Sequence, residues 1–272
     1  KYMPEQKDLK HFYKGFSNLY FNDYHLTWGD PRRNPCDGWD GVECINDIKI
    51  SNNGSVYLKN LKQWEKSVIK KDVITLLYTS SPLRTFMANL QEVTPEKNFA
   101  HRINVLRMLK KLLLNHSNLN ILYKTFMGID LSNDPIIEIL SEYVNQGRVQ
   151  LTSTPPIDLM PKVDIAFFDM ISTGFAEAIQ IGVPTLVYKK YPDYELVSDE
   201  GKIINDELKK CGMVFFDTEA GIRSFEMILN DLPGFQEKGR DPIRRFQELC
   251  AYPVSKKEFI HNLENKIVSS NS

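Results

Sequence analysis

Hydroxyl-bearing residues, small residues and lysines stand where several apolar runs of the sequence end. The clearest case is VDIAFFDMISTGFAEAIQIGVPTLVY (163–188), in which an apolar run stops at Ser172-Thr173-Gly174 and a helical pattern begins. A helix start offers unpaired backbone N–H groups and the positive end of the helix dipole, which together suit a phosphate. Ser172 and Thr173 can donate to such an anion, and Gly174 lets it approach the backbone. A plain Ser/Thr N-cap explains the same residues and stays open as an alternative.

The same chemistry recurs at other ends of apolar runs. Thr79 and Ser80 end the first run, with Arg84 close behind, and Lys124 lies near the end of the second run. Glu177 follows Thr173 by one helical turn and shares its face of the helix. A carboxylate there suits hydrogen bonds from the hydroxyls of a ribose or a sugar. The alternative is a solvated carboxylate that the helix dipole stabilises.

These residues need a scaffold of alternating strands and helices. The six apolar runs predict strands, and apolar residues at helical spacing predict helices between them. The expected strands are 72–79, 119–126, 148–154, 163–169, 183–189 and 213–217, and the expected helices are 101–116, 134–147, 172–182, 195–212 and 218–232. This order predicts an α/β fold with a doubly wound parallel sheet of about six strands. In such a sheet ligands bind at the carboxyl ends of the strands, near the switch in strand order.

The first 70 residues differ from the rest of the chain. They are rich in aromatic residues, Asn, Asp and Gly, which predicts a short irregular segment, and 46–58 suggests a hairpin around Asn53-Gly54. We therefore divide the chain into an irregular segment, 1–70, and a ligand-binding domain with C-terminal helices, 71–272. The irregular segment is interpreted as the remnant of, or the linker from, an N-terminal domain, which makes the chain a fragment of a longer protein.

Composition and missing motifs exclude several functions. A net charge of −1, from 34 basic and 35 acidic residues, gives no field to gather nucleic acid, so we expect no nucleic-acid partner. No apolar run approaches the roughly 20 residues that span a bilayer. The four scattered cysteines predict reduced thiols in the cytoplasm and no metal site, and a Cys36–Cys44 bridge stays open as an alternative. The chain has no GxGxxG, P-loop or GxSxG motif, which argues against a dinucleotide site, a P-loop nucleotidase and a serine hydrolase.

The passage 163–188 resembles the signature region in the C-terminal half of GT-B glycosyltransferases. In those enzymes a strand ends, a Ser/Thr/Gly segment begins a helix that bears a glutamate, and Gly-x-Pro leads into the next strand. The closest resemblance is to bacterial transferases of surface-polysaccharide assembly, of the O-antigen, capsule and teichoic-acid type. YFNDYHLTWGDPRR (20–33) is also similar to a stretch of surface-polysaccharide transferases. One departure is Phe126, which stands where those enzymes place the histidine of a K-x-H segment that begins here with Lys124.

The resemblance implies a Rossmann-like domain that holds a nucleotide-sugar or CDP-polyol donor. Ser172, Thr173 and Gly174 would take the diphosphate, together with the loop of Thr79, Ser80 and Arg84. Glu177 would bind the ribose or the donor sugar, and Lys124 would offset the charge of the leaving group. No metal and no cofactor besides the donor is expected. His25, beside Trp28, is the candidate catalytic base, although a surface or packing role is the alternative.

The function implied is transfer of a glycosyl or glycerophosphoryl group to a glycan or lipid-linked acceptor of a surface polysaccharide. The enzyme is expected in the bacterial cytoplasm, and peripheral association with the inner face of the membrane stays open. Two alternatives are a sugar-nucleotide epimerase of the same architecture and a non-catalytic module that binds nucleotide or glycan.

Overall fold

The computed structural model of the 272-residue chain describes residues 24–27, 49–64, 69, 72–81, 95–124, 134–189 and 199–270. Contacts divide the chain into two compact units. The first comprises 1–60, 195–204 and 244–272, and the second comprises 61–194 and 205–243. Of the described residues, no helix is both long enough and apolar enough to cross a membrane.

A parallel sheet of six strands forms the centre of the second unit. Its order is β5-β4-β3-β6-β7-β8, and every neighbouring pair is parallel. The strands are β3 (Ile74–Thr79), β4 (Leu119–Lys124), β5 (Val149–Thr152), β6 (Ile165–Phe168), β7 (Thr185–Tyr188) and β8 (Val214–Phe215). The chain builds outward from β3 on one side and then returns to β3 to build on the other. The order therefore switches between β3 and β6, which is where such sheets bind ligands. The predicted fold class is confirmed.

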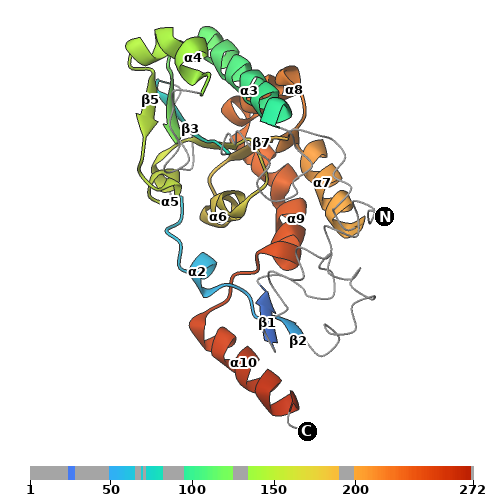
Figure 1. The fold of residues 1–272 in the computed structure, drawn as a ribbon. Coiled ribbons are helices and arrows are strands. Elements are labelled where there is room, and N and C mark those ends of the chain that lie inside the picture. Colours follow the sequence, from blue (N-terminus) through green and yellow to red (C-terminus); the bar gives the residue numbers. More distant parts are fainter. Residues whose placement is uncertain are drawn as a thin grey trace, which may run out of the picture. The chain divides into compact units, whose positions relative to one another are not determined.

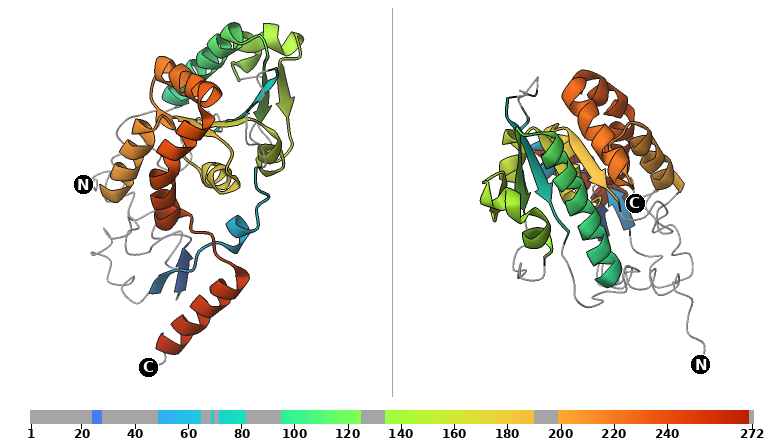
Figure 2. Two further views of the ribbon diagram at one scale, coloured as in Figure 1. Left: turned by 180° about the vertical axis from the view of Figure 1, so that it is seen from behind. Right: turned by 90° about the horizontal axis from the view of Figure 1, so that it is seen from above.

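Helices follow the strands as the apolar periodicity predicts. They are α3 (Pro95–Asn115), α4 (Ile136–Asn145), α5 (Pro156–Leu159), the 3₁₀ turn η5 (Met160–Lys162), α6 (Thr173–Ile181), α7 (Asp199–Lys210), α8 (Thr218–Asn230) and α9 (Leu232–Cys250). α6 ends at Gly182, whose φ of 84° is left-handed and suits a residue without a side chain. Figure 1 shows α3, α4 and α8 on one side of the sheet and α5 and α6 on the other. Figure 2 shows from further sides how α3 lies along the sheet.

Strand alternation gives each face of the sheet its own side chains. In the central strands Tyr78, Tyr123 and Phe167 are neighbours in register, and the Tyr78 ring contacts each of the other two. They face the side of α3. The next residues, Thr79, Lys124 and Phe168, are also in register and face the other side. At the carboxyl edge, the aromatic row therefore faces the α3 side of the sheet, and the row with Thr79 and Lys124 faces the opposite side.

The first unit contains two short parallel strands. β1 (Tyr24–Thr27) pairs with β2 (Lys49–Asn52), and the helical turn α2 (Val56–Lys59) follows. The predicted hairpin in 46–58 is therefore wrong, because β2 pairs with a distant strand and the residues after Gly54 turn into a helix. Gly54 does have the positive φ that was predicted, at 66°. The helix α10 (Lys256–Ser270) belongs to this unit as well.

Side-chain caps determine where α2 and α10 begin. The Ser55 hydroxyl accepts from the backbone N–H of Leu58 at 3.2 Å, which caps α2. At the start of α10, the Ser255 N–H donates to the Glu258 carboxylate at 2.7 Å, and the Glu258 N–H donates to the Ser255 hydroxyl at 3.2 Å. This reciprocal pair is a capping box. The turn α2 was not predicted from the aromatic-rich composition of the first 70 residues, whereas α10 belongs to the C-terminal helices that were predicted.

Candidate functional site

The start of α6 lies at the carboxyl edge of the sheet, three residues after Asp169 and beside the switch between β3 and β6. Ser172 is the N-cap, with extended backbone (φ −142°, ψ −178°), and its side chain makes no capping hydrogen bond. The first turn of α6 contains no acidic residue. The first N–H groups of a helix have no intrahelical acceptor. An N-cap hydroxyl that leaves them uncapped keeps the positive end of α6 open to an anion.

Gly174 brings the backbone of α6 close to the sheet. A Cβ atom at this position would lie 3.0 Å from Cε1 of Phe168, which is nearer than carbon atoms normally approach. The Phe168 ring is buried and packs edge-on against Phe175. Only glycine therefore fits this first turn without displacing the ring. The absence of a side chain lets the first turn of α6 lie close to the end of β6 and leaves the backbone of Gly174 accessible to a ligand.

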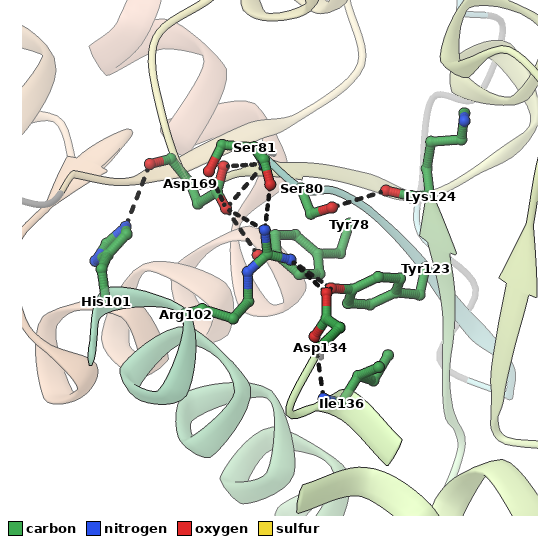
Figure 3. A network of polar contacts seen from close by, with 10 residues as sticks. All are labelled: Tyr78, Ser80, Ser81, His101, Arg102, Tyr123, Lys124, Asp134, Ile136 and Asp169. Carbon is green, nitrogen blue, oxygen red and sulfur yellow. Dashed lines mark hydrogen bonds and ion pairs between the residues drawn. The ribbon is translucent and has the colours of Figure 1, made fainter. Parts of the chain in front are cut away.

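Thr79 ends β3 on the same face of the sheet as Phe168, its neighbour in register. Its hydroxyl oxygen is buried and makes no hydrogen bond. A buried hydroxyl without a partner costs free energy, because it has lost its bonds to water. Next to it in register lies Lys124, which is buried, and Figure 3 shows its side chain pointing away from the polar residues on the other face.

On the opposite face, Arg102 of α3 is 2% exposed and is surrounded by polar groups (Figure 3). Its guanidinium donates to the Tyr123 hydroxyl and to the Ser81 carbonyl. It also forms ion pairs with Asp134 at 3.5 Å and with Asp169 at 3.6 Å. We call these residues, together with Tyr78, the arginine cluster. Arg102 thereby connects the chain after β3, the end of β4, the start of α4 and the end of β6.

Each of the two carboxylates of the arginine cluster accepts hydrogen bonds from at least two donors. Asp169 accepts from the Tyr78 hydroxyl at 2.9 Å, from the Ser81 N–H at 2.8 Å and from the Ser81 hydroxyl at 3.0 Å. Asp134 accepts from the Tyr123 hydroxyl at 2.8 Å and from the Ile136 N–H at the start of α4 at 3.1 Å. Because their partners come from neighbouring loops and helix starts, these carboxylates hold those segments in place.

The pKa values of the two tyrosines and of Arg102 agree with these hydrogen bonds and ion pairs. Burial raises the pKa of Tyr78 well above its usual value, with Asp169 adding to the rise and Arg102 opposing it. Burial raises the pKa of Tyr123 in the same way, and Asp134 adds to it. Burial alone would lower the pKa of Arg102, but the surrounding phenols and carboxylates raise it overall. Both phenols therefore stay protonated at neutral pH and can donate to the carboxylates.

The end of β7 carries another buried cation. Lys189 follows β7, is 8% exposed, and donates to the Asn205 side chain at 2.8 Å. Burial lowers the pKa of Lys189. Nearby, His101 of α3 packs edge-on against Tyr188, and its Nε2 lies 3.3 Å from the Asp169 carbonyl oxygen. Among the described residues, no group of three His, Cys, Asp or Glu side chains is placed to hold a metal ion.

Most of the residues chosen from the sequence lie in the second unit of the structure. Thr79, Ser80, Lys124, Ser172, Thr173, Gly174 and Glu177 all belong to the second unit, at strand ends or in α6. Ser80 is buried, and its hydroxyl donates to the Lys124 carbonyl at 3.2 Å, so that hydroxyl is already engaged. His25 lies in β1 of the first unit, and its side chain is outside the described residues. Arg84 lies outside them altogether.

Sequence reasoning missed the arginine cluster. A signal for Arg102 was nevertheless present, because it lies three and four residues before Val105 and Leu106 and so falls on the apolar stripe of α3. A charged residue on a buried stripe needs a partner. Its partners could not be named in advance, since Asp134 and Asp169 come from other elements.

Comparison with known families identifies a family of transferases. A model of the LIC12162 family, described as a transferase family, matches residues 9–231. Among curated proteins, none matches the sequence significantly. The family match confirms the resemblance to transferases that the sequence predicted.

Solved structures similar to this one include enzymes of sugar-nucleotide and cell-wall chemistry. A wall teichoic acid polymerase, TagF (H444N variant), is 14% identical with a TM-score of 0.48, and the alignment covers 100% of this chain and 64% of that one. Anabaena Alr3699/HepE, in complex with UDP and glucose, is 11% identical with a TM-score of 0.49, over 98% and 67%. A Listeria monocytogenes chain described as a UDP-N-acetylglucosamine 2-epimerase is 14% identical with a TM-score of 0.45, over 74% and 47%. The chain thus spans about half to two thirds of the length of the polymerase and the epimerase.

Proposed function

Since the chain belongs to the LIC12162 family of transferases, we propose that it is a GT-B glycosyl or glycerophosphoryl transferase whose nucleotide-activated donor binds at the start of α6. The observation that carries this proposal is Ser172, an N-cap whose hydroxyl leaves the helix uncapped. The diphosphate of the donor accepts from this hydroxyl and from the first N–H groups of α6, at the positive end of its dipole. The acceptor is a glycan or lipid-linked chain of a surface polysaccharide.

The other predicted residues have distinct roles in this proposal. Thr79 offers a buried hydroxyl without a partner on the same face of the sheet as Phe168, whose ring packs beneath Gly174. Lys124, the neighbour of Thr79 in register, offsets the negative charge that develops on the leaving phosphate. Glu177 accepts from the hydroxyls of the ribose or the donor sugar. His25 of the first unit is proposed as the base that takes the proton of the acceptor hydroxyl.

Calorimetry with UDP, CDP, GDP and CMP tests the donor site. We expect one nucleoside diphosphate to bind more tightly than CMP, because the second phosphate is the group that reaches α6. If the folded protein binds none of the four, the proposal is wrong. Glu177→Ala should weaken the nucleotide-sugar or CDP-polyol donor by about 1–3 kcal/mol if it holds a buried hydroxyl. Analysis of the products with the full donor then separates transfer, which consumes an acceptor, from epimerisation, which needs none.

A further inference from the structure

Arg102 is held by several elements of the fold at once. Its guanidinium contacts four other residues of the arginine cluster, which come from three different strand ends and the start of α4. The cluster holds one buried cation against two buried carboxylates, and Arg102 Nε is buried without a hydrogen-bond partner. Buried ion pairs with incomplete bonding stabilise a fold no better than apolar side chains of the same volume do. The arrangement is therefore better explained by the geometry it imposes than by the stability it adds.

That geometry involves both sides of the switch in strand order. The chain after β3 is held at Ser81, whose carbonyl accepts from Arg102 while its N–H donates to Asp169 at 2.8 Å. The chain after β6 is held at Asp169, three residues before Ser172. The guanidinium and the carboxylate thus connect the residues that follow Thr79 to those that precede α6.

We propose that Arg102 is a positioning residue that keeps the ends of β3 and β6 at the spacing required to bind the donor diphosphate. Arg102 itself does not contact the donor, because its side chain lies against the Tyr78 and Tyr123 rings on the α3 side of the sheet. Its effect passes through Ser81 and Asp169. The binding part of this inference rests on the donor site proposed above, whereas the positioning part concerns the protein without ligand.

The chain offers a matched control in Arg148. It precedes β5 and donates to the carbonyls of Leu119 at 3.3 Å and Leu113 at 2.9 Å, and its guanidinium lies over the Tyr143 ring. It thus joins α3 and β4 as Arg102 does, but at the amino ends of the strands. Replacing either arginine with lysine keeps the charge and removes the planar fork of donors. Only the change at Arg102 should affect the carboxyl edge.

The experiment compares Arg102→Lys, Arg148→Lys and the wild type by amide hydrogen exchange without ligand and by calorimetry with UDP, CDP and GDP. For Arg102→Lys we expect at least tenfold faster exchange at the Ser81 amide and over residues 169–174. We also expect the affinity for the bound diphosphate to fall at least tenfold, and the preference for that diphosphate over its monophosphate to shrink. Arg148→Lys should leave both measurements within about twofold of the wild type, even when its thermal unfolding temperature falls equally.

Each result decides the question. Exchange and affinity unchanged in folded Arg102→Lys would overturn the proposal, and so would equal changes in the Arg148 variant, because both outcomes indicate an ordinary buried ion pair. If Arg102→Lys does not fold, Asp134→Asn takes its place, since it removes one counter-charge of Arg102 without touching Ser81 or Asp169, and the same criteria apply. If the wild type binds no nucleotide, the proposed donor site is wrong, and the exchange result alone decides whether Arg102 positions these strand ends.

Discussion

Replacing Ser172 with alanine should leave the stability of the protein almost unchanged while weakening donor binding. An N-cap side chain that bonds to the helix is worth about 0.5–2 kcal/mol, and this value is lost on substitution by alanine. Ser172 makes no such bond. The expected loss in free energy of unfolding for Ser172→Ala is therefore below about 0.5 kcal/mol, the lower limit for a working cap.

Asp217 provides the comparison within the same unit. It is the N-cap of α8, its backbone is extended like that of Ser172, and its carboxylate accepts from the Ala220 N–H at 2.8 Å. Asp217→Ala should cost about 0.5–2 kcal/mol, because a bond to an orphan N–H and a favourable contact with the helix dipole are both lost. Both variants can be measured by urea unfolding, with a common slope as the check that the transition is unchanged.

Donor affinity should change in the opposite order, with the larger loss in Ser172→Ala and the smaller in Asp217→Ala. A hydrogen bond to a charged group is worth about 1.5–3 kcal/mol, which corresponds to a loss of roughly 10- to 100-fold in affinity. We expect that loss for Ser172→Ala and less than about a twofold change for Asp217→Ala, whose helix starts at another strand end. Two results together would refute the reasoning: a loss of stability in Ser172→Ala as large as that in Asp217→Ala, and a dissociation constant for the nucleoside diphosphate equal to that of the wild type.

Three further predictions follow from the packing and the pKa shifts. Gly221→Ala in α8 should lower the free energy of unfolding, measured in urea, by about 1–3 kcal/mol. The reason is that the added Cβ would lie 2.5 Å from Cε2 of the buried Phe215 ring. An unchanged urea midpoint would contradict this prediction. The Ser255 hydroxyl and N–H lower the pKa of Glu258, so the capping box stabilises α10 above the usual pKa of 4.5 and is lost as the pH falls through the lowered value. Glu258→Gln should accordingly speed amide exchange in α10 at pH 7 and make no difference at pH 2, and equal effects at both would exclude this. Burial lowers the pKa of Lys189, so between the lowered value and 10.5 the unfolded chain binds more protons than the folded one. The free energy of unfolding of the wild type should therefore rise relative to that of Lys189→Met as the pH increases from 7 towards 10.5. A difference in unfolding free energy that stays constant over this range would show that burial does not penalise this charge.

The alternation of strands and helices could be predicted because it depends on neighbours in the chain. Apolar periodicity, Gly182 at a helix end and Ser172 at a helix start are local signals, and each lies where it was expected. The six strands and the start of α6 followed from them. Parallel strands in an α/β chain place their carboxyl ends at one edge, so the position of the candidate site also followed.

Long-range pairing was decided only by the tertiary structure. Residues 46–58 were predicted as a hairpin because that is the nearest pairing available, but β2 pairs instead with β1, some 25 residues earlier. Arg102 was missed although it is a charge on an apolar stripe, and its partners Asp134 and Asp169 lie roughly 30 and 70 residues further along the chain. A residue's backbone preference depends on its neighbours in sequence, whereas a buried charge finds its partner only after distant strands have packed together. For that reason the sequence determined the elements and the edge of the sheet that carries the candidate site, and the folded structure alone decided which charges meet there.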